Sequence, residues 1–107
     1  MIRGSIWWVE FDPAVGTEIN KTRPAVIVSN DTANKFLARV VVIPLTSNIS
    51  RVYPGEAIIT VNGEKSKAMT DQIMSADKSR LKNKIGELSK NDMISLETAM
   101  RQFLNLF

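Results

Sequence analysis

Hydrophobic and polar positions along the chain fall into short runs that predict β-strands. Residues 6–11 are rich in aromatic and β-branched side chains, which favour strands. The run from Pro24 to Val28 is apolar and closed by Ser-Asn-Asp turn chemistry, so we expect a strand buried on both faces. Further strands are predicted at the ranges 38–45, 56–61, 65–70, 71–77 and 85–88. Asn62-Gly63 predicts a tight hairpin between the ranges 56–61 and 65–70.

The periodicity changes after residue 88, where apolar residues recur at spacings of three and four and predict an amphipathic helix laid on the sheet. Ser89 is the expected N-cap, with Asp92 three residues later completing a capping-box-like start. The methionine-rich stripe of this helix is more typical of a core than of a partner groove. The predicted fold is mainly β with a C-terminal helix: one small antiparallel barrel or sandwich spanning residues 1–107 as a single domain.

Turns and breaks in these runs carry their own predictions. Residues 30–36 suit one helical turn or a longer loop, with Asn30 or Asp31 as its cap. Pro44 is predicted to mark a sheet edge, a bulge or a strand end, because proline cannot donate to a central ladder. Residues 12–23 are polar and read as a hairpin loop between the first two strands.

Arg23 stands at the entrance of the second strand, and Pro24 stiffens the backbone that carries its guanidinium. A rigidly held charge at the rim of a buried strand suits an anion site. The alternative is a surface arginine paired with Glu18 or Asp12. Thr46, Ser47 and Asn48 follow the third strand as a second polar group, with turn capping as their alternative role.

Aromatic side chains in the first strand are expected to pack in the core rather than stack on bases. Phe11 is the expected exception, because it ends that strand.

Composition narrows the chemistry. The 107 residues contain no cysteine and no histidine, so thiolate nucleophiles, Cys or His metal ligands and imidazole bases are excluded. Acidic residues are scattered, and we expect neither a metal nor a cofactor. The net charge of +3 favours a polyanionic partner. No apolar run is long enough for a signal peptide or a membrane span, so we expect a soluble protein of the cytoplasm, without a membrane partner.

RNA cleavage suits a site of this kind, because the 2′-hydroxyl of RNA can attack the adjacent phosphorus itself. The protein then has to hold an in-line geometry and stabilise the charge of the phosphorane. Arg23 can contact two non-bridging oxygens at once, and Thr46 can donate a hydrogen bond to one of them. Glu18 is a candidate proton acceptor if its loop reaches the site.

Several segments, in order, resemble the MazF/PemK toxins of bacterial toxin–antitoxin systems. They are 6–13 (IWWVEFDP), 16–18 (GTE), 22–29 (TRPAVIVS), 44–47 (PLTS), 71–73 (DQI), 77–78 (DK) and 86–89 (GELS). The resemblance covers essentially the whole chain. It departs in the first loop, where Ile19, Asn20 and Lys21 replace the Gln and small residues common in the family.

The resemblance implies an SH3-like barrel, a homodimer and a metal-independent endoribonuclease that cuts single-stranded RNA at short motifs. Its products would be a 2′,3′-cyclic phosphate and a 5′-hydroxyl. The family's catalytic arginine and threonine fall on Arg23 and Thr46. The residues expected to bind RNA are Phe11, Asn20, Lys21, Ser47, Asn48 and Gln72. The resemblance also implies an antitoxin that blocks the RNA groove with an acidic C-terminal segment.

Two other functions fit the same fold. One is a non-catalytic toxin that binds DNA gyrase, and the other is a basic RNA-binding barrel without activity. RNA cleavage in a tube separates both from the ribonuclease.

Overall fold

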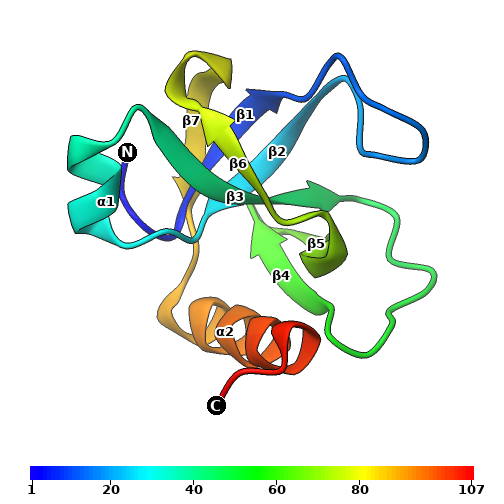
Figure 1. Cartoon of the computed structure of the whole chain (residues 1–107). Coiled ribbons are helices and arrows are strands. Elements are labelled where there is room, and N and C mark those ends of the chain that lie inside the picture. Colours follow the sequence, from blue (N-terminus) through cyan, green and yellow to red (C-terminus); the bar gives the residue numbers. More distant parts are fainter.

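The computed structural model describes all 107 residues and shows a curled antiparallel sheet with one long helix against its side (Figure 1). The strands are β1 (Ser5–Glu10), β2 (Thr22–Ile27), β3 (Arg39–Thr46), β4 (Ala57–Val61), β5 (Glu64–Ala68), β6 (Met74–Asp77) and β7 (Leu81–Glu87). The helices are α1 (Asp31–Phe36) and α2 (Lys90–Leu104), with short 3-10 turns at Thr70–Gln72 and Lys78–Arg80. The predicted antiparallel barrel with a C-terminal helix is confirmed.

The sheet runs in the order β4-β5-β3-β2-β1-β7, and β6 pairs with the free part of β3. β3 is therefore a central strand, and the expectation that Pro44 marks an edge, a bulge or a strand end is wrong. The ladder from β3 to β6 ends at Val42, and the ladder to β5 begins at Leu45. Pro44 lies between them, where β3 exchanges one partner strand for the other, so its missing N–H interrupts neither ladder.

Other boundaries differ from prediction in the second half of the chain. Residues 71–77 do not form one strand, because Thr70–Gln72 turns as a 3-10 helix and only Met74–Asp77 pairs with β3. β7 begins at Leu81, four residues before the predicted start. The tight hairpin at Asn62-Gly63 is present, with Val61 opposite Glu64. Asn30 caps α1, as one of the two predicted candidates.

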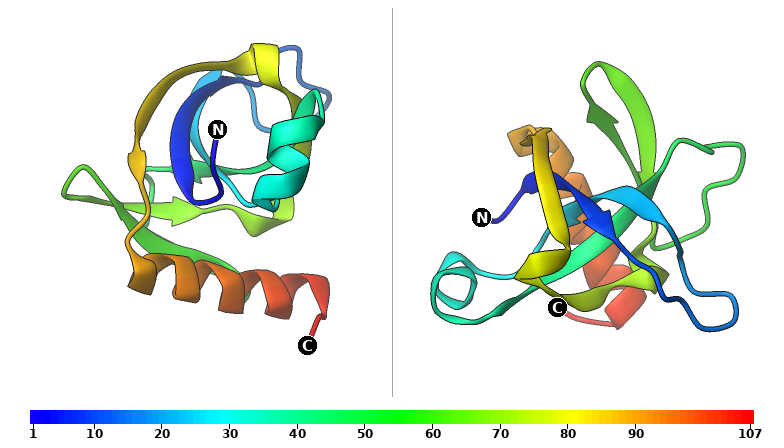
Figure 2. Two further views of the ribbon diagram at one scale, coloured as in Figure 1. Left: turned by 90° about the vertical axis from the view of Figure 1, so that its left-hand side faces the viewer. Right: turned by 90° about the horizontal axis from the view of Figure 1, so that it is seen from above.

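The two faces of β2 explain why its sequence is apolar throughout. Val26 packs in one hydrophobic cluster with Ile6 and Leu96, whereas Ala25 and Ile27 pack in a second cluster on the other face. The first cluster includes Leu96 and Ala99 of α2, the helix that lies against the curled sheet in Figure 2, and the second draws its residues from β1, β2, β3, β6 and β7 and from Phe11. The prediction of a strand buried on both faces is confirmed.

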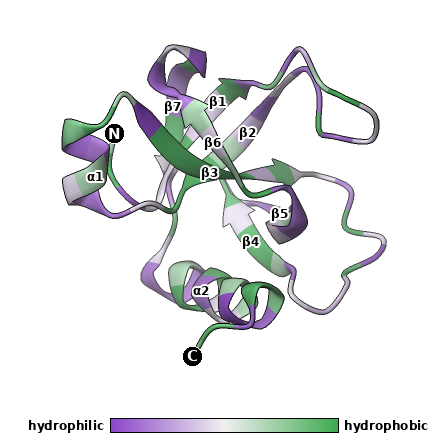
Figure 3. Ribbon diagram, in the orientation of Figure 1, coloured by the Kyte–Doolittle hydropathy of each residue, from purple (hydrophilic) through white to green (hydrophobic).

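α2 begins as predicted, with the Ser89 hydroxyl accepting the N–H of Asp92 at 3.1 Å. The reciprocal half of the capping box is absent, because the Asp92 carboxylate accepts the N–H of Thr60 in β4 at 2.9 Å and so ties the helix to the sheet. Leu96 and Ala99 are buried, but Phe103 and Phe107 are exposed. The apolar stripe is therefore core only in its first half. In Figure 3 β3 is mostly hydrophobic, whereas α2 mixes hydrophobic and hydrophilic residues. Neither helix combines the length and apolarity needed to cross a membrane.

Candidate functional site

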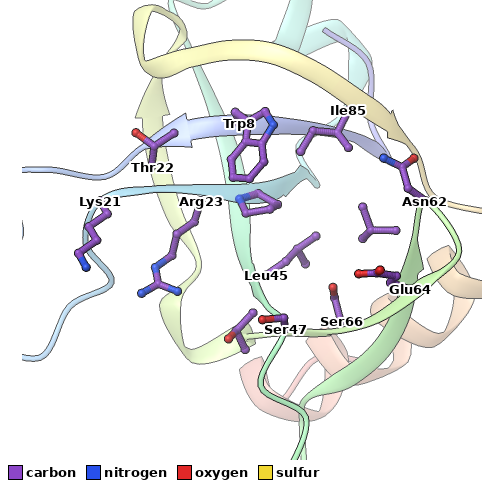
Figure 4. A pocket seen from close by; sticks show the side chains of 13 residues that line it. Trp8, Lys21, Thr22, Arg23, Leu45, Ser47, Asn62, Glu64, Ser66 and Ile85 are labelled. Atoms are coloured by element: carbon purple, nitrogen blue, oxygen red, sulfur yellow. The ribbon is translucent and has the colours of Figure 1, made fainter.

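Pairing between β2 and β3 brings Arg23 and Thr46 to one place. The ladder matches Ala25 with Pro44, and continuing the same antiparallel register by two residues sets Arg23 opposite Thr46. Both residues line a cavity of about 650 Å³ (Figure 4). The whole lining consists of Trp8, Lys21, Thr22, Arg23, Pro24, Leu45, Thr46, Ser47, Val61, Asn62, Glu64, Ser66 and Ile85.

The Arg23 guanidinium is free of carboxylate partners. Its Nε donates to the Asn20 carbonyl at 3.1 Å, and no salt bridge involves it. The alternative of pairing with Glu18 or Asp12 is not realised, because no salt bridge joins Arg23 to either carboxylate. The Glu18 carboxylate accepts the N–H of Val15 at 2.7 Å, and that of Asp12 accepts the N–H of Lys21 at 2.9 Å. The terminal nitrogens of Arg23 therefore remain available for two parallel contacts to an anion.

Thr46 and its neighbours supply the hydroxyl groups of the cavity. Thr46 Oγ1 accepts the N–H of Asn48 at 3.2 Å, which leaves the hydroxyl proton free to donate. Ser47 also lines the cavity. Asn48 does not, and its side-chain oxygen accepts both the N–H and the hydroxyl of Ser50. Asn48 therefore caps the turn that follows β3, which is the alternative role predicted for it.

A second, separate cavity of about 300 Å³ holds three of the other predicted residues, Phe11, Glu18 and Gln72. Phe11 is only 3 % exposed and belongs to a core cluster, so its ring is packed against neighbouring side chains in this structure. Gln72 Oε1 accepts the N–H of Ile19 at 3.3 Å and so helps to hold the first loop. Glu18 lies outside the Arg23 cavity, and its carboxylate is engaged within its own turn.

The first loop is held at several points. The Lys21 carbonyl accepts the N–H of Phe11 at 2.8 Å, and Arg80 Nη1 donates to the carbonyls of Glu10 and Asp12 at 2.9 and 2.8 Å. This loop delivers Lys21 to the edge of the cavity, while Asn20 contributes its carbonyl to Arg23.

Sequence reasoning missed the wall of the cavity formed by Trp8 of β1, which is paired with Pro24, and by Asn62, Glu64 and Ser66 of the β4–β5 hairpin (Figure 4). Trp8 was expected in the core but is 42 % exposed. It shares one face of β1 with Glu10, and no other element covers that face near the end of the strand. The hairpin signal at Asn62-Gly63 was visible. Its place beside the site depends on the curl of the sheet, which brings Asn62 next to Gly86 of β7.

The charges of the cavity are unevenly distributed. Lys21 and Arg23 lie at one side, and Glu64, the only carboxylate in the lining, lies at the other (Figure 4). Nowhere do three or more His, Cys, Asp or Glu side chains gather where they could hold a metal ion. The arrangement presents two cations and several hydroxyls to an anion at one end.

Comparison with known proteins gives the family. Residues 2–104 match the model of the PemK-like, MazF-like toxins of type II toxin–antitoxin systems. The chain is 41 % identical to endoribonuclease MazF9 of Mycobacterium tuberculosis, covering 100 % of this chain and 98 % of the relative. It is 34 % identical to endoribonuclease MazF of Staphylococcus epidermidis, covering 97 % and 91 % of the two chains.

Solved structures agree on the fold. MazF from Deinococcus radiodurans superposes with a TM-score of 0.86 at 23 % identity, covering 99 % of this chain and 97 % of the other. A mycobacterial endoribonuclease in complex with its cognate antitoxin gives a TM-score of 0.84 at 24 % identity, covering 100 % and 97 %. From the family match and the two curated relatives, this chain belongs to the PemK-like, MazF-like toxins of type II toxin–antitoxin systems.

Proposed function

We propose that this chain is the toxin of its pair and acts as an endoribonuclease that cuts single-stranded RNA, and so messenger RNA, in the cytoplasm. One observation carries the proposal: Arg23 and Thr46 line the same cavity, and neither is engaged with a competing carboxylate. The names of the curated relatives support the same activity.

The reaction needs no nucleophile from the protein. The 2′-oxygen of the RNA attacks the adjacent phosphorus, an O2′–P bond forms, and the P–O5′ bond breaks. The proton lost by the 2′-hydroxyl balances the one gained by the leaving 5′-oxygen. The products are a 2′,3′-cyclic phosphate and a 5′-hydroxyl.

Arg23 and Thr46 act on the charge that develops during this attack. The two free nitrogens of Arg23 contact the non-bridging oxygens, where negative charge increases in the phosphorane. The Thr46 hydroxyl donates to one of the same oxygens. Because both residues stand on adjacent paired strands, they are pre-positioned, and little reorganisation is needed at the moment of reaction.

Glu18 takes no proton in this proposal. Its carboxylate lies in the second cavity and accepts the N–H of Val15, so a role as base would require the first loop to rearrange. Stabilisation of the phosphorane charge is therefore the main contribution of the protein. Lys21 and Ser47 would hold neighbouring parts of the RNA backbone.

The partners follow from the charge of the site. An acidic, extended segment of an antitoxin would compete with RNA for Lys21 and Arg23 and switch the enzyme off. We also propose a homodimer. The exposed second half of the α2 stripe, including Phe103 and Phe107, offers apolar surface for such contacts.

The test is cleavage of a mixed RNA pool by purified protein in EDTA, with mapping of the new 5′ ends. We expect 5′-hydroxyl ends at a short motif, and no cut where the nucleotide before the scissile phosphate carries 2′-deoxyribose. Intact RNA, or a cut at the deoxy position, would refute the mechanism. Intact RNA together with inhibited DNA gyrase would support the gyrase-binding alternative instead.

A further inference from the structure

The wall of the cavity formed by Trp8 and the β4–β5 hairpin carries polar side chains without partners in the protein. The indole Nε1 of Trp8 and the side chains of Asn62, Glu64 and Ser66 make no hydrogen bond or salt bridge. Two other exposed carboxylates are paired: Glu10 with Lys82 and Glu87 with Lys84. Unpartnered polar groups that face a shared cavity are available to a ligand.

The cavity is larger than a phosphate site requires. Its volume of about 650 Å³ lies within the range of about 300–1,000 Å³ typical of pockets that enclose a small organic molecule. With the scissile phosphate at Arg23, the space toward the β4–β5 hairpin can hold a nucleobase of the same strand. In Figure 4 Trp8 and Ile85 lie above this space, with Asn62 and Glu64 at its far side.

The chemistry of this wall suits an unpaired base. The half-exposed Trp8 ring offers a stacking surface, which any base can use. A carboxylate such as that of Glu64 accepts hydrogen bonds, so it favours a base whose Watson–Crick edge carries adjacent donors. Guanine offers two such donors, N1–H and the 2-amino group. Uracil offers only one N–H, and the two carbonyl oxygens on either side of it are repelled by the carboxylate.

We propose that Trp8 and the β4–β5 hairpin form a base-binding subsite, in which Glu64 selects guanine next to the scissile phosphate. This inference rests on the proposed ribonuclease function and names a determinant of its sequence preference. Asn62 and Ser66 complete the polar rim of the subsite. The β4–β5 ladder and the pairing of β5 with β3 set the backbone position of Glu64 relative to the strand that carries Thr46.

The first experiment compares the wild type with Glu64→Gln on a random RNA pool and then on a cognate RNA. The matched control is Glu10→Gln, an exposed carboxylate outside the cavity. Wild type should show guanine at one position flanking the cut. Replacing that guanine by inosine, which lacks the 2-amino donor, should lower kcat/KM about tenfold. Glu64→Gln should cleave both RNAs at nearly equal rates, and Glu10→Gln should behave as wild type.

Each other outcome is decisive. If Glu64→Gln keeps the wild-type preference at every flanking position, Glu64 reads no base and the inference fails. An equal loss of kcat on all sequences would make Glu64 a proton acceptor and would also overturn it. A wild-type motif without guanine beside the cut refutes it as well. If the wild type cuts no RNA at all, the proposed function itself is refuted. If the wild type is active but has other base preferences, only the inference about Glu64 fails.

Trp8 gives a second, independent measurement. Trp8→Ala should raise KM on all RNAs while leaving the order of base preferences unchanged, because stacking does not discriminate strongly between bases. Trp8→Phe should restore much of the loss. An unchanged KM for Trp8→Ala, in a protein with the thermal melting curve of wild type, would contradict stacking at this wall.

Discussion

Two cavities border the first loop, and they use their polar side chains in opposite ways. In the larger one, Arg23 has no carboxylate partner, and Lys21 and Glu64 make no salt bridge. In the smaller one, the carboxylate of Glu18 and the amide of Gln72 accept backbone N–H groups of the loop. In the smaller cavity these two side chains hold the loop, whereas the charged side chains of the larger one are open to a ligand.

The difference has a general physical basis. A polar group that already has a partner must give up that hydrogen bond before it can bind a ligand, whereas an unpartnered group exchanges only water. Arg23 and Glu18 are both charged and both were candidates from sequence. Their partners, rather than their residue types, separate a binding group from a structural one.

Replacing Arg23 should give the largest effect and tests the larger cavity directly. Arg23→Ala should lower kcat/KM for RNA about 10³-fold, because it removes the cation facing the phosphorane oxygens. Arg23→Lys should recover only part of the activity, since a single ammonium cannot make the two parallel contacts. The measurement is the initial cleavage rate in EDTA, with thermal melting as the control for folding. Wild-type rates for Arg23→Ala would remove Arg23 from the mechanism.

Thr46→Ala should have the next largest effect, a decrease of about 10²-fold in kcat, because one hydrogen-bond donor to the transition state is lost. Thr46→Ser keeps the hydroxyl and is the matched control, expected to retain most of the rate. Single-turnover cleavage with saturating enzyme separates the chemical step from RNA binding. If Ala and Ser variants are equally slow, the threonine methyl group and its packing are what matter.

Glu18→Gln should change the cleavage rate by less than about threefold, because the amide oxygen can still accept the N–H of Val15 and no proton transfer is lost. A general base in that position would instead contribute about 10²- to 10⁴-fold. The pH dependence of the rate distinguishes the two cases. A loss of that size would show that the loop rearranges on RNA and carries Glu18 into the larger cavity.

The sequence alone predicted the parts of the site that local pattern determines. Arg23 precedes an apolar strand with a proline at its start, and Thr46 ends the next strand along the chain. Neighbouring antiparallel strands then place the two together. The fold class followed in the same way, from short apolar runs and one helical stripe.

The parts of the site that the sequence does not show depend on contacts between distant segments. Gln72 reaches the loop at Ile19 across 53 positions of sequence, and no local signal shows that contact. Phe11 ends its strand but is covered by a core cluster that includes Ala76 and Leu81. Trp8 faces the cavity because the curl of the sheet brings Asn62 beside β7. Alternation along a strand says which residues share a face, but not what covers that face.

Asp77 is a carboxylate that has hydrogen-bond partners but lies outside both cavities, so replacing it should have the smallest effect of these substitutions. Hydrogen bonds from Ser79, and then the charges of Arg39 and Arg80, hold its pKa below the usual value of 3.8. Because the pKa of this carboxyl is lower in the folded state than in the unfolded state, its charged form stabilises the fold at pH values above the unfolded-state pKa. This stabilisation is lost as the pH falls through the folded-state pKa. Asp77→Asn should therefore melt slightly below wild type at neutral pH, and the difference should disappear in acid. A difference in melting temperature that is constant with pH would mean that the carboxylate charge contributes nothing at this turn.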